Sequence, residues 1–327
     1  MRVFYFYSNL LVAQVLNDQI IISFYSSEKM SLKTIIYFIT MFTTITISVQ
    51  SQDVEDTLMI YGRNRFYKTH LPLGYNFQNQ YPVVFVFHGG LGNPDLTEKQ
   101  TGFSKKADEE GFIVVYPYGT GSFDKKLLTW NTWDCCGYAD KKNINDVDFI
   151  KALLAEIKSK YSIDDKRIYA SGLSNGGMMC YLLACELPEY FAAVAPVAAT
   201  MFDTVACNSK SEVSIIIFNS IDDQHIPYNG GVGEKSLVDV EKLPVETVVN
   251  LWVNKYNGYL MHKSESSSFH KTNYKNNNGT EIVLYKMLSG GHSWPGGEKI
   301  RAFADNPVKN ISATDLIWEF FKNNPKH

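Results

Sequence analysis

The sequence predicts an α/β fold in which a mostly parallel, doubly wound sheet begins with an antiparallel hairpin. The first observation behind this prediction is that short apolar runs, such as 83–87 and 112–117, alternate with segments of helical periodicity. The second is that these runs are apolar throughout, as in strands that helices cover on both faces. The third is composition, since 327 residues with 45% hydrophobic side chains suit one domain with a large core.

The first 51 residues resemble a targeting segment more than part of a folded domain. Met30 is a possible second start, and Lys33 precedes an apolar, β-branched run over 34–49. A basic residue, an apolar stretch and small residues before the cut make up a secretory signal, so we expect cleavage after Ser51. A membrane anchor is the alternative, because the run approaches the length that spans a bilayer.

The region 52–327 is expected to form one folded domain, which opens with a hairpin around Gly62. Apolar strands follow at 83–87 and 112–117. The next stretch, 118–142, is polar and aromatic, and connections of that length are usually functional.

Strands and helices continue to alternate in the second half of the chain. The apolar spacing over 149–157 predicts a helix that Asp146 is placed to cap. The segment 264–278 is polar, and we expect it to be a surface excursion. The remaining predicted elements are strands at 167–171, 192–198, 214–218 and 282–287 and helices after 177, over 244–256 and over 313–322.

A G-x-S-x-G pentapeptide, Gly172 to Gly176, stands between the strand at 167–171 and a helix. In such a turn the residues around the serine must be small, because strand and helix approach closely. The Ser174 hydroxyl is then exposed above the sheet, near a helix N-terminus that favours negative charge. The pentapeptide alone arises by chance about 0.1 times in such a chain, so the flanking strand and helix carry the prediction.

A serine that attacks acyl groups needs a base, an acid that orients the base, and donors for the developing oxyanion. Asp222 and Asp223 directly follow the strand at 214–218, and His292 follows the strand at 282–287. Ligand sites gather at these carboxyl ends of strands in open α/β sheets. The chain order Ser, Asp, His therefore predicts a catalytic triad at one edge of the sheet.

Five motifs occur in order along the chain: HGG at 88–90, CCG at 135–137, GLSNGGMM at 172–179, PYNGG at 227–231 and GGHSWPGG at 290–297. In this order they resemble the secreted esterases related to polyhydroxybutyrate depolymerases and to feruloyl or acetyl-xylan esterases. The resemblance covers most of 57–322. It implies that 52–327 is a single catalytic domain of the α/β-hydrolase fold, a serine esterase that needs no metal or cofactor.

The resemblance also assigns roles to the triad. In the family the acid lies four residues before the Pro-Tyr pair, which is Asp223 here. Asp222 stays as the alternative, because 219–221 depart from the family's His-Gly-Thr. Ser174 would attack the ester carbonyl, and His292 would take the serine proton and deliver it to the leaving alcohol.

The oxyanion hole is expected to use backbone N–H groups of Asn175 and of Gly90 or Leu91, in keeping with the general elbow geometry. His88 ends a buried strand, and we expect it to brace the HGG loop. Aromatic side chains on nearby loops are candidates to line an acyl or sugar cleft, with simple loop packing as the alternative. These aromatic residues are Trp130, Trp133, Tyr228 and Trp294.

Charge and cysteine content limit the possible partners. The net charge of −3, with Lys and Arg scattered, gives no electrostatic footprint for nucleic acid. The five cysteines lack metal-site spacing, so we expect no metal. Cys185 and Cys207 are plausible disulfide partners, while the pairing of Cys135, Cys136 and Cys180 stays open.

The leading hypothesis is a secreted serine esterase that acts on short or aromatic acyl esters, including feruloyl or acetyl groups on plant cell-wall polysaccharide. Hydrolysis of a polyhydroxyalkanoate or its oligomers is the alternative within the class. A non-catalytic binding protein and a peptidase are the alternatives from other classes. We expect an ester substrate, no nucleic-acid partner, and no stable membrane association after signal cleavage.

Overall fold

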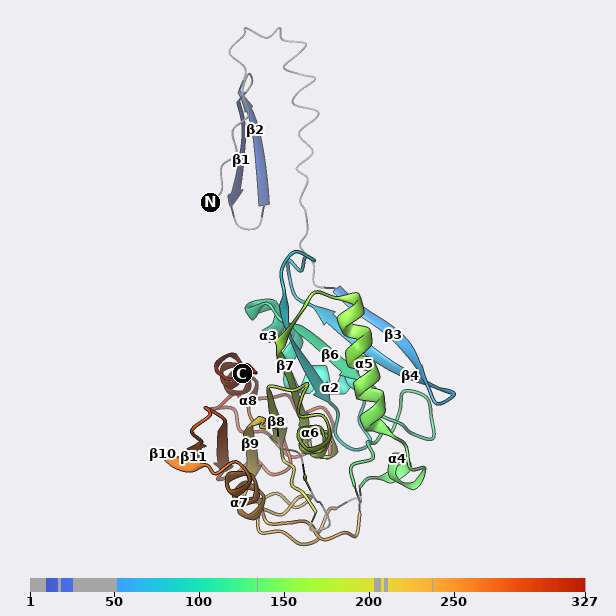
Figure 1. The fold of residues 1–327 in the computed structure, drawn as a ribbon, viewed down its shortest axis with the longest axis vertical. Helices are drawn as coiled ribbons and strands as arrows, with labels where there is room; N and C mark the ends of the chain where they lie inside the picture. The colour runs from blue at the N-terminus through green and yellow to red at the C-terminus, as the bar shows by residue number, and fades with distance from the viewer. Residues whose placement is uncertain are drawn as a thin grey trace. The chain divides into compact units, whose positions relative to one another are not determined.

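The computed structural model describes 52–133, 135–202, 207–208, 211–236 and 238–326, and the backbone of 10–16 and 19–25 (Figure 1). The chain divides into two compact units, Met1–Gln50 and Ser51–His327. In the first, β1 (Leu10–Leu16) and β2 (Gln19–Tyr25) pair in an antiparallel sheet that the sequence pattern did not predict. Met30, the apolar run 34–49 and the cleavage site at Ser51 lie outside the described residues.

Ten strands form a single mixed sheet in the second unit. They are β3 (Gln52–Ile60), β4 (Arg63–Leu71), β5 (Tyr81–Phe87), β6 (Ile113–Pro117), β7 (Ile163–Leu173), β8 (Ala193–Val197), β9 (Ser214–Ser220), β10 (Tyr259–Glu265), β11 (Phe269–Lys275) and β12 (Glu281–Met287).

The strand order is β10-β11-β12-β9-β8-β7-β5-β6-β4-β3. The strands from β12 across to β6 are parallel. The pairs at both edges are antiparallel, including the β3–β4 hairpin that turns at Tyr61 and Gly62. The predicted fold class, a mostly parallel α/β sheet with an N-terminal antiparallel hairpin, is confirmed.

Helices cover both faces of this sheet (Figure 1). One core cluster packs β-sheet side chains against α5, α6 and α7, and the other packs them against α3 and α8. The helices are α2 (Pro94–Thr101), α3 (Phe103–Glu110), α4 (Gly137–Lys141), α5 (Asp146–Lys160), α6 (Asn175–Glu186), α7 (Val245–Lys255) and α8 (Ala313–Asn323). Among the described residues no helix is long and apolar enough to cross a membrane.

Strand β5 shows why these strands are apolar throughout. All of its residues are buried. Val83, Phe85 and Phe87 point into one core cluster, and Val84 and Val86 point into the other. Because successive side chains of a strand point to opposite faces, a strand between two helix layers has no polar face.

Two local predictions need correction. The segment 264–278 is not a loop, because β10 and β11 extend the sheet there as an edge hairpin. The side chains of this hairpin are exposed or half-buried. The sequence therefore shows only a weak alternation of apolar and polar residues, which is the pattern that would predict strands. The cap of α5 is Asn145, whose side chain accepts the N–H of Asp148, while Asp146 is buried inside the first turn.

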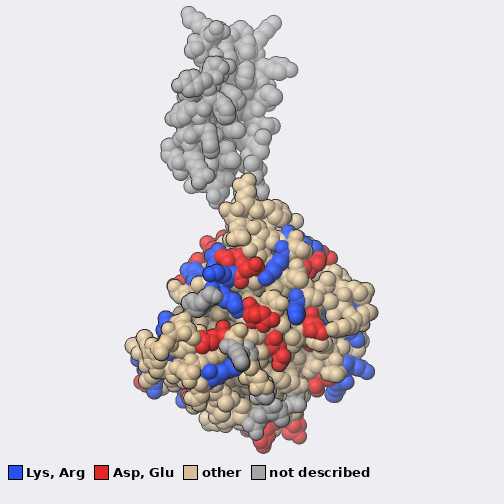
Figure 2. All heavy atoms as spheres, in the orientation of Figure 1, with Lys and Arg blue, Asp and Glu red and all other residues tan. Residues whose placement is uncertain are grey.

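The surface charges are mixed in sign. Figure 2 shows Lys and Arg interspersed with Asp and Glu over the face in view. Several charged side chains of the second unit are paired, for example Lys106 with Glu109 at 2.7 Å and Lys158 with Asp165 at 2.7 Å. This face therefore offers no extended basic surface to a nucleic acid.

Candidate active site

The turn after β7 has the geometry that the pentapeptide predicts. β7 ends at Leu173, Ser174 has φ 57° and ψ −122°, and α6 begins directly afterwards. A Cβ at Gly172 would lie 2.5 Å from the carbonyl oxygen of Gly176, and one at Gly176 would collide with the carbonyl oxygen of Phe87. Both glycines are needed because strand, turn and helix pass within van der Waals contact of one another.

The histidine and one aspartate at the strand ends are in contact. His292 Nδ1 lies 2.8 Å from Asp223 Oδ2, and the side chain of Asp223 is fully buried. Asp223 Oδ1 accepts the backbone N–H groups of His225 (2.8 Å) and Ile226 (2.9 Å). These bonds hold Asp223 in one orientation, with its second oxygen toward the imidazole.

The neighbouring Asp222 has different partners. Its Oδ1 accepts the N–H of Gly291 at 2.9 Å and the hydroxyl of Ser220 at 2.5 Å. The backbone N–H of His292 is donated to Asp305 at 2.7 Å. Asp222 and Asp305 thus fix the backbone at Gly291 and His292, while Asp223 contacts the ring itself.

Ser174 and His292 line one cavity with a volume of about 200 Å³. Gly90, Leu91 and Asn175, the residues predicted for the oxyanion hole, line the same cavity. Asn175 is the first residue of α6, and backbone N–H groups in the first turn of a helix have no partner within the helix. The structure therefore places the predicted nucleophile, base and oxyanion-hole residues around one space, and Asp223 contacts the base from behind.

The loop after β5 is held by His88 and Arg301. His88 is buried, its Nδ1 donates to the Gly89 carbonyl (2.8 Å), and its Nε2 accepts the N–H of Gly119 (2.9 Å). Burial lowers the pKa of His88 to about 4, so the ring is neutral and suits both bonds. Arg301 donates to the carbonyl of Leu91, which has φ 60°. His88 thus braces this loop, as expected.

Asn175 also anchors the long connection that precedes α4. Its Oδ1 accepts the N–H of Trp130 (2.7 Å), and its Nδ2 donates to the Trp130 carbonyl and to Thr132 Oγ1 (both 3.1 Å). Asp146 accepts the N–H of Asn131 (2.8 Å) and forms a buried ion pair with Arg65 (2.6 Å). The connection is therefore fixed to the turn that carries Ser174.

The structure places the predicted substrate-binding aromatics elsewhere than the cavity. Trp130 is fully buried, packs on His88 with ring centres 4.8 Å apart, and donates to the His88 carbonyl. Tyr228 is buried and donates to Glu246, and Trp294 is buried and donates to Thr314. The half-buried Trp133 packs against the core cluster that includes α5, α6 and α7. These rings pack the loops, which was the alternative interpretation.

Residues that were not predicted to bind substrate form part of the cavity wall. His225 lies with its ring centre 4.6 Å from that of His292. Burial, followed by the neighbouring His292, lowers the pKa of His225. Cys135, Cys136 and Met178 also line the cavity. The sequence held one signal for His225, namely its position two residues after Asp223. The backbone N–H groups of His225 and Ile226 bind the Asp223 carboxylate, which keeps His225 close to the catalytic residues.

The cysteines form two disulfides in the described part of the chain. Cys185 pairs with Cys207, as expected, and the neighbours Cys135 and Cys136 pair with each other. Cys180 is buried with a free thiol, and burial raises its pKa. The cavity wall next to Ser174 therefore contains a disulfide.

One cluster, away from the cavity, has atoms of metal-ligand type. Ligand atoms of Asp53, His70 and Glu98 lie within 4.8 Å of one another. Lys68 Nζ lies between the two carboxylates, 2.6 Å from Glu98 and 3.2 Å from Asp53. The lysine ammonium already supplies the cation at this site, and these residues do not line the cavity around Ser174.

A known protein family matches part of this chain. The model of the esterase PHB depolymerase family matches residues 66–229, half of the chain. The match includes Ser174 and Asp223 and ends before His292. It confirms the family resemblance found in the sequence.

Two relatives illustrate the similarity. Feruloyl esterase B of Piromyces equi is 31% identical over 167 residues, which cover 50% of this chain and 30% of that protein. The bifunctional acetylxylan esterase/xylanase XynS20E of Neocallimastix patriciarum is 32% identical over 139 residues, which cover 42% of this chain and 18% of that protein. The chain thus spans less than a third of the length of either relative.

A solved structure supports the fold. The acetyl xylan esterase from Aspergillus awamori matches with a TM-score of 0.57 at 14% identity, over 83% of this chain and 99% of that chain. At this identity the likeness concerns the fold alone. Together with the strand order, it assigns the second unit to the α/β-hydrolase fold.

Proposed function

This chain belongs to the esterase PHB depolymerase family, and on that premise we propose that it is a secreted serine esterase that hydrolyses carboxylic esters through an acyl-enzyme. The observation that carries the proposal is the 2.8 Å contact between His292 Nδ1 and Asp223 Oδ2 at the cavity that Ser174 also lines. Nucleophile, base and acid come from the ends of three strands in the order that this chemistry uses.

The first half of the reaction forms the acyl-enzyme. Ser174 Oγ attacks the ester carbonyl carbon while His292 Nε2 takes the hydroxyl proton. Asp223 accepts the Nδ1–H of His292, which fixes the tautomer and stabilises the imidazolium. The tetrahedral oxyanion is stabilised by the backbone N–H of Asn175 and that of Gly90 or Leu91. The intermediate collapses when His292 protonates the leaving alcohol.

The second half releases the acid. Water attacks the acyl carbon, His292 takes the water proton, and the same N–H groups stabilise the second oxyanion. Ser174 leaves with the proton from His292, and the carboxylic acid departs. Each step uses groups that line one cavity, together with Asp223 behind His292, and none calls for a metal or cofactor.

The substrate class is an ester with a short or aromatic acyl group, including feruloyl or acetyl groups on plant cell-wall polysaccharide. The names of the relatives, a feruloyl esterase and an acetylxylan esterase, support it. Hydroxyalkanoate oligomers are the second candidate, since the family description includes PHB depolymerase. A cavity of about 200 Å³ favours one small acyl group over a polymer segment.

Secretion is part of the proposal. Two disulfides suit an oxidising compartment. Cleavage after Ser51 would leave β3 complete, because that strand begins at Gln52. N-terminal sequencing of the exported protein tests this step, and a start at residue 1, 2 or 30 would contradict it.

The esterase activity is tested with the domain 52–327 and p-nitrophenyl acetate and butyrate. We expect release of p-nitrophenol at a rate at least about 10³-fold above that of Ser174→Ala, because loss of the nucleophile leaves only the oxyanion hole and binding. Equal rates for the two proteins would overturn the proposal and favour a non-catalytic binding protein.

A further inference from the structure

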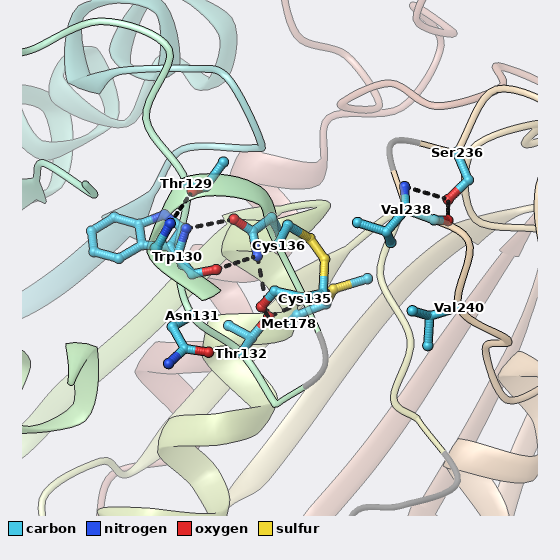
Figure 3. The surroundings of a disulfide bond; sticks show 12 residues. Thr129, Trp130, Asn131, Thr132, Cys135, Cys136, Met178, Ser236, Val238 and Val240 are labelled. Carbon is cyan, nitrogen blue, oxygen red and sulfur yellow. Dashed lines mark hydrogen bonds between the residues drawn. A yellow bond between two sulfur atoms is a disulfide. The ribbon is translucent and has the colours of Figure 1, made fainter. Parts of the chain in front are cut away.

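We propose that the disulfide between Cys135 and Cys136 forms one wall of an acyl subsite that selects aromatic acyl groups, an inference that rests on the proposed esterase function. Both cysteines line the cavity that contains Ser174, and so does Met178, one helical turn beyond the serine. All three sulfur-bearing side chains are buried, with exposures of 1%, 6% and 1%. Figure 3 shows Met178 next to this disulfide, so three sulfur-bearing side chains lie together in the lining of the cavity that Ser174 also lines.

This wall is fixed relative to the reacting atoms. Cys136 donates its backbone N–H to the Trp130 carbonyl (2.9 Å), and Thr132 Oγ1 donates to the Cys135 carbonyl (2.8 Å). Trp130 and Thr132 are the two residues that the Asn175 side chain binds. The residue after the nucleophile thus positions the disulfide, so a group attached to Ser174 meets a preformed surface.

Ser236, Val238 and Lys242 provide the facing wall. Figure 3 shows Val238 and Ser236 on the chain that faces the disulfide, and both line the cavity. Lys242 is buried at the same wall, where its Nζ donates to Ser236 Oγ (2.9 Å) and to the Val240 carbonyl (3.2 Å). An apolar slot with a polar end matches an aromatic ring that carries oxygen substituents.

The enclosed side of the cavity suits the acyl group better than the alcohol. The cavity is also lined by the loop that contains Phe303, whose side chain is 82% exposed, so the cavity is open to solvent at that loop. The alcohol must leave after the first step, while the acyl group stays bound to Ser174 until water attacks. The open side is therefore the exit of the alcohol, and the sulfur wall contacts the acyl group.

Size and chemistry both favour an aromatic ring. A dry cavity of roughly 150 Å³ binds benzene, so about 200 Å³ holds a substituted ring. Sulfur atoms make favourable contacts with aromatic rings, which aliphatic side chains lack. An acetyl group would leave most of this wall untouched and would gain little from it.

The test compares two esters of the same alcohol, methyl ferulate and methyl butyrate, so that only the acyl group differs. In Cys135→Ala/Cys136→Ala we expect kcat/KM for methyl ferulate to fall about tenfold more than for methyl butyrate, a loss typical of a pocket contact. Val238→Phe, which narrows the slot and leaves the disulfide intact, should shift the ratio in the same direction. Cys185→Ala/Cys207→Ala is the matched control, because that disulfide does not line the cavity.

The outcomes separate this subsite from the esterase function itself. If both cavity variants and the control leave the ferulate-to-butyrate ratio within twofold of wild type, the sulfur wall does not select the acyl group. Wild-type hydrolysis of methyl butyrate without hydrolysis of methyl ferulate also overturns the subsite, while the esterase proposal stands. Inactivity on every ester overturns both. Should the cysteine variant fail to fold, the ratio in Val238→Phe decides.

Discussion

Two of the regions that line the cavity are built differently. The loops that carry Ser174, Asp223 and His292 each follow directly from a strand of the parallel sheet, so the sheet sets their positions. The connection 118–142 has no strand of the sheet within it and is held by side chains, chiefly Asn175 and Asp146. The positions of the catalytic groups therefore depend on the sheet, while the disulfide wall of the cavity depends on a few polar anchors.

The largest effect should come from a strand-end residue. His292→Ala is expected to lower kcat/KM for p-nitrophenyl acetate by about 10⁴-fold or more, because the serine loses its base. The melting temperature should stay close to that of wild type, since His292 is part of no core cluster. His262→Ala, at an exposed position of β10, serves as the control. Comparable losses of kcat/KM in His292→Ala and His262→Ala would contradict the role of His292 as the base.

Removing an anchor of the connection should reduce stability and activity together. Asp146→Asn leaves the Arg65 guanidinium without its buried partner at 2.6 Å, which is expected to cost about 3–5 kcal/mol of unfolding free energy. Urea unfolding measures this cost. Asp165→Asn removes an exposed partner of Lys158 and should cost less than about 1 kcal/mol. Equal costs would show that the buried pair does not anchor the connection.

A smaller effect concerns pH and the loop after β5. Burial lowers the pKa of His88 from 6.5 to about 4, so between these values the unfolded chain binds a proton that the native protein does not. The contribution of His88 to the free energy of unfolding is therefore fully present above pH 6.5. It is lost as the pH drops toward 4, by about 3 kcal/mol in all. Urea unfolding between pH 7 and pH 4 tests this, with His88→Gln as the comparison. A pH dependence that is unchanged in His88→Gln would refute the assignment to His88.

The sequence was most informative where a local pattern determines the structure. The apolar strands, the pentapeptide around Ser174 and the order of Asp223 and His292 were predictable, because each depends on periodicity or on a strand end. The β10–β11 hairpin was missed, because an edge hairpin with exposed side chains lacks an apolar pattern. The hairpin is held in the sheet by the backbone pairing of β11 with β12 rather than by the burial of its own side chains.

The cavity wall was the least predictable part. Trp130 and Trp294 are large aromatics near the catalytic motifs, yet their rings fill the core, since a side chain on a loop turns toward whichever neighbours exclude water. The sequence left the disulfide partners of Cys135 and Cys136 undecided. Their place in the cavity wall depends on how the whole connection folds. Side-chain direction in an irregular loop depends on contacts distant in sequence, such as those from Asn175.

The central claim is that the groups at three strand ends act as one catalytic unit, and the two adjacent aspartates test it most directly. kcat for p-nitrophenyl acetate is measured in Asp223→Asn and Asp222→Asn under the same conditions. We predict a fall of about 10⁴-fold in Asp223→Asn, because the amide favours the wrong imidazole tautomer. A far smaller fall is expected in Asp222→Asn, because the Asp222 carboxylate binds the Gly291 backbone and Ser220 and not the imidazole. Loss of turnover in Asp222→Asn alone would contradict the account.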